Sequence, residues 1–88
     1  MTDIVELVSE RKKTHGSFED HARITQELKY ILHKEHSERH FRSQPPLTDR
    51  QLESLEMIAH KIGRIVAGDA SFQDHWDDIA GYARIANG

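Results

Sequence analysis

The sequence contains no cysteine, and this absence excludes two ways in which small proteins are often stabilised. No disulfide can cross-link the chain, and no thiolate is available for a structural zinc site. Because the composition fits a reducing compartment, we expect a cytoplasmic location.

Long hydrophobic runs and a basic leader are missing as well. The first residues mix acids with single apolar side chains, unlike a signal peptide, and no apolar stretch approaches the roughly 20 residues that span a bilayer. We therefore expect no interaction with membranes. The net charge is −3, and the basic residues are scattered among acids. Nucleic acid is for this reason not expected as a partner.

Glycine and aromatic residues are sparse. The five glycines do not form a glycine-rich phosphate-binding loop, and no serine lies in a nucleophile-elbow motif, so a nucleophilic triad is not supported. Only 36% of the 88 residues are hydrophobic, and the chain has one tryptophan. A domain of this size buries little apolar surface by itself, so we predict self-association into a homo-oligomer.

Apolar residues recur with helical spacing almost everywhere, and no segment alternates with a period of two. The pattern predicts an all-α protein: a single helical domain over residues 1–88, built as a small bundle of about four helices. We predict helices at Asp3–Lys13, at Ser17–Glu35, at Thr48–Gly68 and from Ser71 onward, the last three starting at an N-cap residue. A polar segment with two prolines, at about 37–47, is predicted to be a linker.

Four carboxylates in two pairs are the most informative feature that the sequence does contain. Glu53 and Glu56 are three residues apart in the third predicted helix, and Asp74 and Asp77 are three apart in the fourth. Residues at this spacing project from nearly the same helix face, and Mg²⁺ prefers several oxygen ligands. If the two helices cross closely, the four acids can hold Mg²⁺. The structural alternative is that acids early in a helix cap it and interact with its dipole.

The seven histidines have both functional and structural interpretations. His33, His36 and His40 recur at three and four, as transition-metal ligands can, but a solvated helix end is the favoured reading. We expect His21 and His75 to be partly exposed. The remaining two histidines are given structural roles: His60 is interpreted as a surface partner of Glu53 and Glu56, and His15 as a turn residue. The aromatic residues of the fourth helix are expected to pack in the core or at a subunit contact; they are Phe72, Trp76 and Tyr82.

Three segments of the chain resemble a family of small phage and prophage proteins. They are THGSFEDHARI at 14–24, HKIGR at 60–64 and DHWDDIAGYA at 74–83. That family is similar in turn to all-α nucleoside triphosphate pyrophosphohydrolases of the MazG kind, whose E-x-x-E and E-x-x-D motifs bind Mg²⁺. Glu53, Glu56 and Asp77 match those motifs, whereas Asp74 replaces a glutamate.

The resemblance implies binding of a nucleotide, or its Mg²⁺-dependent hydrolysis to the monophosphate and pyrophosphate. Lys61 and Arg64, three residues apart on the outer side of the third helix, would then contact phosphate oxygens; as a structural alternative they form a solvated face. The resemblance also allows a second function class, a non-catalytic phage protein that binds and inhibits a host protein, for example one of host defence. In either class the location would be the cytoplasm of the host cell.

Overall fold

The computed structural model describes residues 4–88 as four α-helices and one short 3-10 helix, with no strand in that range. The helices are α1 (Ile4–His15), α2 (Phe18–Ser37), η1 (Arg39–Arg42), α3 (Asp49–Ala67) and α4 (Gln73–Ile85). The predicted all-α fold is thus confirmed. No helix within residues 4–88 has the length and apolar character needed to cross a lipid bilayer.

Two predicted helix starts are confirmed by side-chain capping. Ser17 Oγ accepts the Asp20 backbone N–H at 3.1 Å at the start of α2. At the start of α3, Thr48 Oγ1 accepts the Gln51 backbone N–H at 3.1 Å, and Gln51 Oε1 accepts the Thr48 backbone N–H at 3.0 Å. Because these bonds satisfy backbone donors within one turn, the spacing of the residues was enough to predict both helix starts.

The start of α4 was predicted wrongly. The N-cap residue is Phe72, which makes no side-chain capping bond, and not Ser71. The backbone N–H of Ser71 donates to Asp69 Oδ1 at 2.8 Å, so Ser71 belongs to the preceding turn. The end of α1 also differs: the helix continues to His15 and stops at Gly16, whose φ of 79° favours glycine. Asp3, the predicted first residue of this helix, lies outside the described residues.

The predicted linker is tied to α2. Within it lies η1, and Arg42 donates to Glu35 Oε2 at 3.2 Å and to the Glu35 carbonyl at 2.9 Å. Farther along, His36 Nε2 accepts the backbone N–H of Leu47 at 3.1 Å. These contacts fold the segment back on the end of α2 before α3 begins.

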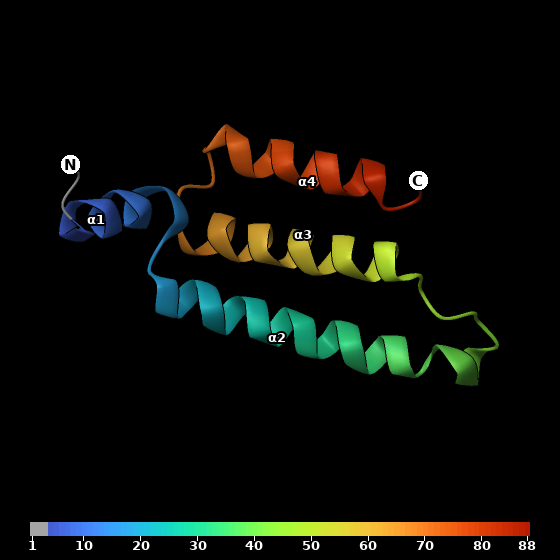
Figure 1. Cartoon of the computed structure of the whole chain (residues 1–88). Helices are drawn as coiled ribbons and strands as arrows, with labels where there is room; N and C mark the ends of the chain where they lie inside the picture. The colour runs from blue at the N-terminus through green and yellow to red at the C-terminus, as the bar shows by residue number, and fades with distance from the viewer. Residues whose placement is uncertain (1–3) are drawn as a thin grey trace.

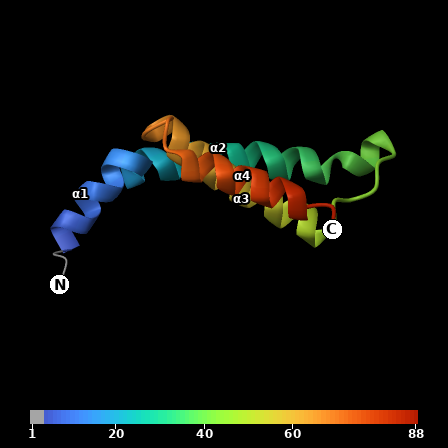
Figure 2. The same ribbon diagram turned by 90° about the horizontal axis from the view of Figure 1, so that it is seen from above.

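The central element of the fold is α3. Figure 1 shows α2 and α4 on either side of α3, and the rotated view in Figure 2 shows these three helices in one thin layer. Within residues 4–88, α2 and α4 do not contact each other, whereas α1 contacts both α2 and α3 at one end of the layer. The radius of gyration, 15.4 Å, exceeds the roughly 12 Å of a compact domain of this length. The molecule is therefore extended.

Few apolar side chains are fully buried in this layer. Ala59 and Ile65 are the buried hydrophobic residues of the described chain. Small residues instead bring the helices together: a Cβ atom on Gly63 would lie 2.5 Å from Thr25 Oγ1 and 2.8 Å from His21 Cδ2. The buried polar and charged residues are His21, Thr25, Ser54, Lys61 and His75. The layer thus has a thin apolar core and an unusual share of buried polar groups.

Candidate functional site

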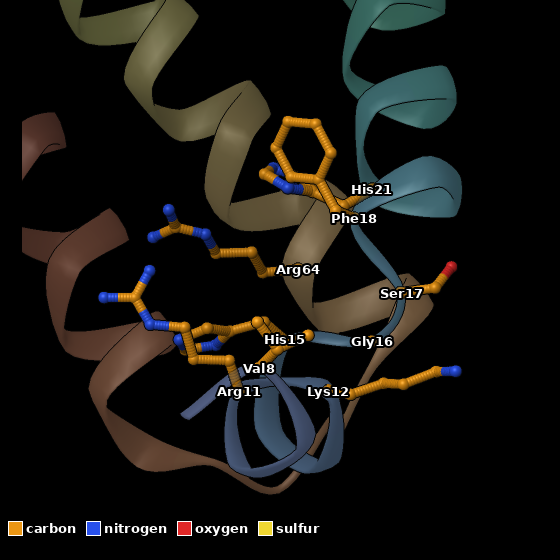
Figure 3. A pocket seen from close by; sticks show the side chains of 9 residues that line it. All are labelled: Val8, Arg11, Lys12, His15, Gly16, Ser17, Phe18, His21 and Arg64. Atoms are coloured by element: carbon orange, nitrogen blue, oxygen red, sulfur yellow. The ribbon is translucent and has the colours of Figure 1, made fainter. Parts of the chain in front are cut away.

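A pocket of about 440 Å³ lies where α1, the α1–α2 turn, the start of α2 and the end of α3 meet. Pockets of this size accommodate small molecules. The lining residues come from all of these elements and are shown in Figure 3: Val8, Arg11, Lys12, His15, Gly16, Ser17, Phe18, His21 and Arg64.

The turn below the pocket is fixed by backbone contacts. The backbone N–H of Asp69 donates to the Thr14 carbonyl at 3.1 Å. Gly16 packs so closely against the Ala67 backbone that a side chain at Gly16 would collide with the Ala67 carbonyl. The positive φ of Gly16 adds a second reason for glycine at this position. These contacts hold the end of α1 against the end of α3, and thereby position the side chains of α1 in the pocket.

The pocket carries positive charge without a balancing carboxylate. Arg11, Lys12 and Arg64 line it, and no aspartate or glutamate does. In Figure 3 the guanidinium groups of Arg11 and Arg64 point to the same side, while Lys12 extends in the other direction. In the part of the chain that the structure describes, neither arginine forms an ion pair. Two guanidinium groups are therefore available to bind an anion.

Two histidines connect α1 to α4 beside this pocket. His15 Nδ1 lies 2.9 Å from His75 Nε2, and His75 Nε2 lies 3.3 Å from the Thr14 carbonyl. A single tautomer satisfies both contacts if the His75 Nε2–H donates and His15 Nδ1 accepts. Burial lowers the pKa of His15, as do the nearby His75, Arg64 and Arg11. Burial also lowers the pKa of His75, against the opposing effect of its bond to the Thr14 carbonyl. We therefore expect both rings to be neutral at pH 7.

A second histidine pair lies between α2 and α3. The rings of His21 and His60 are 5.8 Å apart at an edge-on angle. The pKa of His21 is lowered by burial, by Arg64 and by His60. Burial, Lys29 and Arg64 lower the pKa of His60, while Glu56 and Glu53 oppose this change. The prediction that His60 lies near these two glutamates is consistent with that electrostatic pattern.

The expectation that His21 and His75 are partly exposed is wrong. Their exposed fractions are 8% and 1%. His21 lies one turn before the buried Thr25 on the face of α2 that meets Gly63, and His75 is covered by the end of α1. The spacing of His21 and Thr25 was the available signal for the first. For His75 the signal was its spacing of three and four residues from Phe72 and Ile79 on the apolar side of the fourth helix; Phe72 packs against His75, and His15 of α1 adds to its cover.

The four predicted Mg²⁺ ligands are not brought together within one chain. Glu56 accepts from His33 Nε2 of α2 at 2.7 Å, whereas Asp77 accepts from Gln73 Nε2 of its own helix at 3.0 Å. Glu53 and Asp74 are exposed. Across residues 4–88 no group of three or more aspartate, glutamate or histidine side chains is arranged to hold a metal ion. The separation arises because Glu56 faces α2, while α4 lies on the other side of α3. Mg²⁺ binding by these acids stays a prediction.

The two predicted phosphate contacts have different surroundings. Arg64 lines the pocket, but Lys61 is buried against α4, where its Nζ lies 2.7 Å from Asp78 Oδ2. The placement of Lys61 on an outer face is thus corrected. The hydrogen bond from Lys61 lowers the pKa of the Asp78 carboxyl. A phosphate contact by Lys61 would require this ion pair to open.

Replacement of Asp78 is expected to destabilise the protein more than replacement of Lys61. Asp78→Asn leaves a buried ammonium group without its counter-charge, whereas Lys61→Met removes the charge and keeps most of the aliphatic stem. Thermal unfolding of both variants at pH 7 measures the difference. A smaller loss of Tm for Asp78→Asn than for Lys61→Met would contradict a structural ion pair.

The remaining predicted residues have local roles. His36 binds the Leu47 backbone, as described above, and the ring of His40 packs on Phe41 with centroids 3.9 Å apart. Trp76 is half exposed and donates from Nε1 to the Ala70 carbonyl at 2.8 Å. Phe72 packs against His75 with centroids 4.9 Å apart, and Tyr82 is partly buried. His33 and His36 thus contact different segments: His33 contacts Glu56 of α3, and His36 contacts the backbone before α3.

Sequence comparison shows which family the chain belongs to. The whole chain, residues 1–88, matches the family described as a domain of unknown function (DUF6378), so the protein is a member of that family. No curated protein matches significantly. No solved structure does either.

Proposed function

We propose that this member of the DUF6378 family binds a phosphorylated small molecule, a nucleotide, in the pocket between α1, α2 and α3. The observation that carries the proposal is the pair of guanidinium groups, Arg11 and Arg64, that project to one side of the pocket without an ion-pair partner in the described chain. Guanidinium groups bind phosphate oxygens through two parallel hydrogen bonds. Arg64 is also one of the two residues for which the sequence predicted this role.

The pocket also has the apolar surface that a nucleoside requires. Val8 lines it from α1, and Phe18 lies at its edge with 80% of its surface exposed. An exposed aromatic ring next to cationic groups is a suitable surface for stacking a base. His21, whose ring lies 6.1 Å from that of Phe18, orients this edge of the pocket. Phosphate at the arginines and a base against Phe18 would together occupy a pocket of this volume.

Binding is better supported than hydrolysis. The Mg²⁺-dependent pyrophosphohydrolase activity implied by the resemblance needs carboxylates around the phosphates, and no carboxylate lines this pocket. Hydrolysis would be an additional activity of the same protein, and it is tested separately from binding.

The binding proposal is tested by calorimetric titration with nucleoside mono-, di- and triphosphates and with the matching nucleoside. We expect Arg64→Gln and Arg11→Gln each to weaken triphosphate binding about 10- to 100-fold, the effect of losing a charge-assisted hydrogen bond. Lys12→Gln is the matched control, because Lys12 also lines the pocket but points away from the two arginines. Equal affinity of all three variants and the unaltered protein, or no binding by a folded sample, would refute the proposal.

The hydrolase form is tested by repeating the titration with Mg²⁺ and measuring pyrophosphate release. If binding depends on the arginines alone, Glu56→Gln leaves the Mg²⁺-free affinity unchanged, because Glu56 is bonded to His33 and does not line the pocket. Pyrophosphate release that is lost in Glu56→Gln would establish the hydrolase. Absence of release with intact binding would limit the function to binding.

A further inference from the structure

One face of α3 carries exposed apolar side chains. Leu55, Ile62 and Val66 are spaced by seven and four residues, so they lie on one stripe of the helix. Their exposed fractions are 40%, 36% and 66%. The sequence shows this stripe as the centre of the apolar face, yet the flanking helices do not cover it. They pack instead on the two sides of α3, at Gly63 towards α2 and at Lys61 towards α4.

The stripe continues onto α2. His33 contacts Glu56, which lies about 100° around α3 from Leu55. That contact places His33 on the edge of α2 farther from the stripe. Ile31, two residues earlier and thus about 200° around α2, lies on the nearer edge. Ile31 is 58% exposed.

The same reasoning extends the stripe onto α4. Asp78 contacts Lys61, which lies about 120° from Leu55 in the direction opposite to Glu56. Asp78 is therefore on the farther edge of α4. Trp76, about 200° around α4 from Asp78, lies on the nearer edge and is 48% exposed. We name this apolar surface the open face: Ile31, Leu55, Ile62, Val66 and Trp76.

The side of the layer that carries the open face is large enough for a stable interface. The 19 residues of α3 extend about 28 Å, and three helices spaced by 8–10 Å make a layer about 25 Å wide, roughly 700 Å² in projection. A standard interface buries about 800 Å² per partner, counted over a corrugated surface. The five residues that define the open face are all uncharged, as at the centre of homodimer interfaces.

The thin core indicates which molecule covers this face. Ala59 and Ile65 are the only buried apolar side chains in residues 4–88, a small core for a domain of 88 residues. If the fold needs a partner molecule to bury this face, that partner must be present whenever the chain folds. A second copy of the chain meets that condition. An apolar stripe on the middle helix is also self-complementary, as a two-fold interface demands.

We propose that two copies of the chain pack through their open faces, so that two three-helix layers form a symmetric homodimer with α3 against α3 of the second copy. The open face is then the surface through which the predicted homo-oligomer forms. Arg64 lies about 180° around α3 from Leu55, so the anion pocket is on the opposite face and stays accessible in the dimer. The two proposals are consequently independent, and failure of one leaves the other unaffected.

The proposal is tested by sedimentation analysis across protein concentrations. We expect a mass twice the 10.2 kDa of the chain, and an increase of at least 100-fold in the dissociation constant for Ile62→Glu. Tyr30→Gln is the matched control, because Tyr30 is 70% exposed but lies about 180° around α2 from His21, which faces α3. A folded monomer at 100 µM, or a dimer equally stable in Ile62→Glu, would overturn the proposal and leave the face to a different protein.

Cross-linking keeps the test decisive if Ile62→Glu fails to fold. Because the chain has no cysteine, Ile62→Cys and Tyr30→Cys each provide one thiol for a short bis-maleimide reagent. We expect a cross-linked dimer from Ile62→Cys and none from Tyr30→Cys. The reverse pattern would place the contact elsewhere and refute the assignment to the open face.

Discussion

Replacing Gly63 by alanine is expected to lower Tm, whereas the same replacement at Gly81 is expected to raise it. Both glycines lie inside helices, so both variants gain up to about 1 kcal/mol of helix propensity. At Gly63 the added methyl group meets Thr25 Oγ1 at 2.5 Å and the His21 ring at 2.8 Å, and both side chains are buried. At Gly81 it meets no atom within 4 Å.

The difference between the two variants isolates the cost of forcing α2 and α3 apart. Overpacking of a buried contact costs about 1–3 kcal/mol, which for a domain of this size corresponds to a Tm difference of roughly 10 °C. Thermal unfolding of both variants must be measured at one protein concentration, because association makes Tm concentration-dependent. If Gly63→Ala is as stable as Gly81→Ala, the two helices are not packed as closely as described.

The elements of this fold could be predicted because their signals are local. The capping bonds of Ser17 and of Thr48 with Gln51 involve residues three apart, and the helical spacing of apolar residues extends over each whole helix. By contrast, Ser71 satisfies the same spacing rule but is used in a turn with Asp69. A spacing pattern therefore identifies residues able to cap, and neighbouring backbone geometry decides which of them does.

The packing could not be predicted in the same way. A helical wheel of α3 identifies Leu55 and Ile62 as the apolar centre, and the natural expectation is that this centre faces the neighbouring helices. The neighbours instead approach on the two sides, at Gly63 and at Lys61, because a position without a side chain permits the closest contact and an ion pair satisfies the buried lysine. This arrangement leaves the apolar centre exposed in one chain.

One of the two arginines of the candidate site was predicted from the sequence. Arg64 was predicted to contact phosphate, as the resemblance of its segment implies. Arg11 was not, because it reaches the pocket only through the fold of α1 against α3. That fold depends on Thr14 and Gly16, which meet Asp69 and Ala67 from more than 50 residues later in the chain. The Thr-His-Gly sequence was the one local sign that this turn was special.

Lowering the pH from 7.5 to 5.5 is expected to destabilise the protein substantially. Burial and nearby cations hold the pKa values of four histidines below the ordinary 6.5: His15, His21, His60 and His75. Their neutral forms are favoured in the folded protein, while the unfolded chain takes up protons as the pH falls below 6.5. Stability is therefore retained above this pH and lost below it.

The size of the effect follows from the number of protons. Each histidine that is neutral in the folded state and protonated in the unfolded chain lowers stability by about 1.4 kcal/mol per pH unit. The two most buried, His21 and His75, together lower stability by at most about 2.8 kcal/mol per pH unit, a large part of the stability of a small domain. The lowered pKa of Asp78 does not change the pH dependence of stability between pH 7.5 and 5.5, because its carboxylate stays ionised well below pH 5.5.

His75→Gln tests the contribution of the most buried ring. His75 faces His15 from α1, Lys61 and Arg64 from α3 and Asp78 from α4, and its protonation would add a charge beside two cations. Glutamine can still donate to the Thr14 carbonyl but does not titrate, so the pH slope of the unfolding free energy should decrease, by at most about 1.4 kcal/mol per pH unit. NMR titration of the histidine rings in the unaltered protein gives a second readout that does not depend on folding of the variant. Equal stability at pH 7.5 and 5.5, or a His75 ring that is protonated at pH 6.5 in the folded protein, would show that the junction of α1 and α4 does not require neutral histidines.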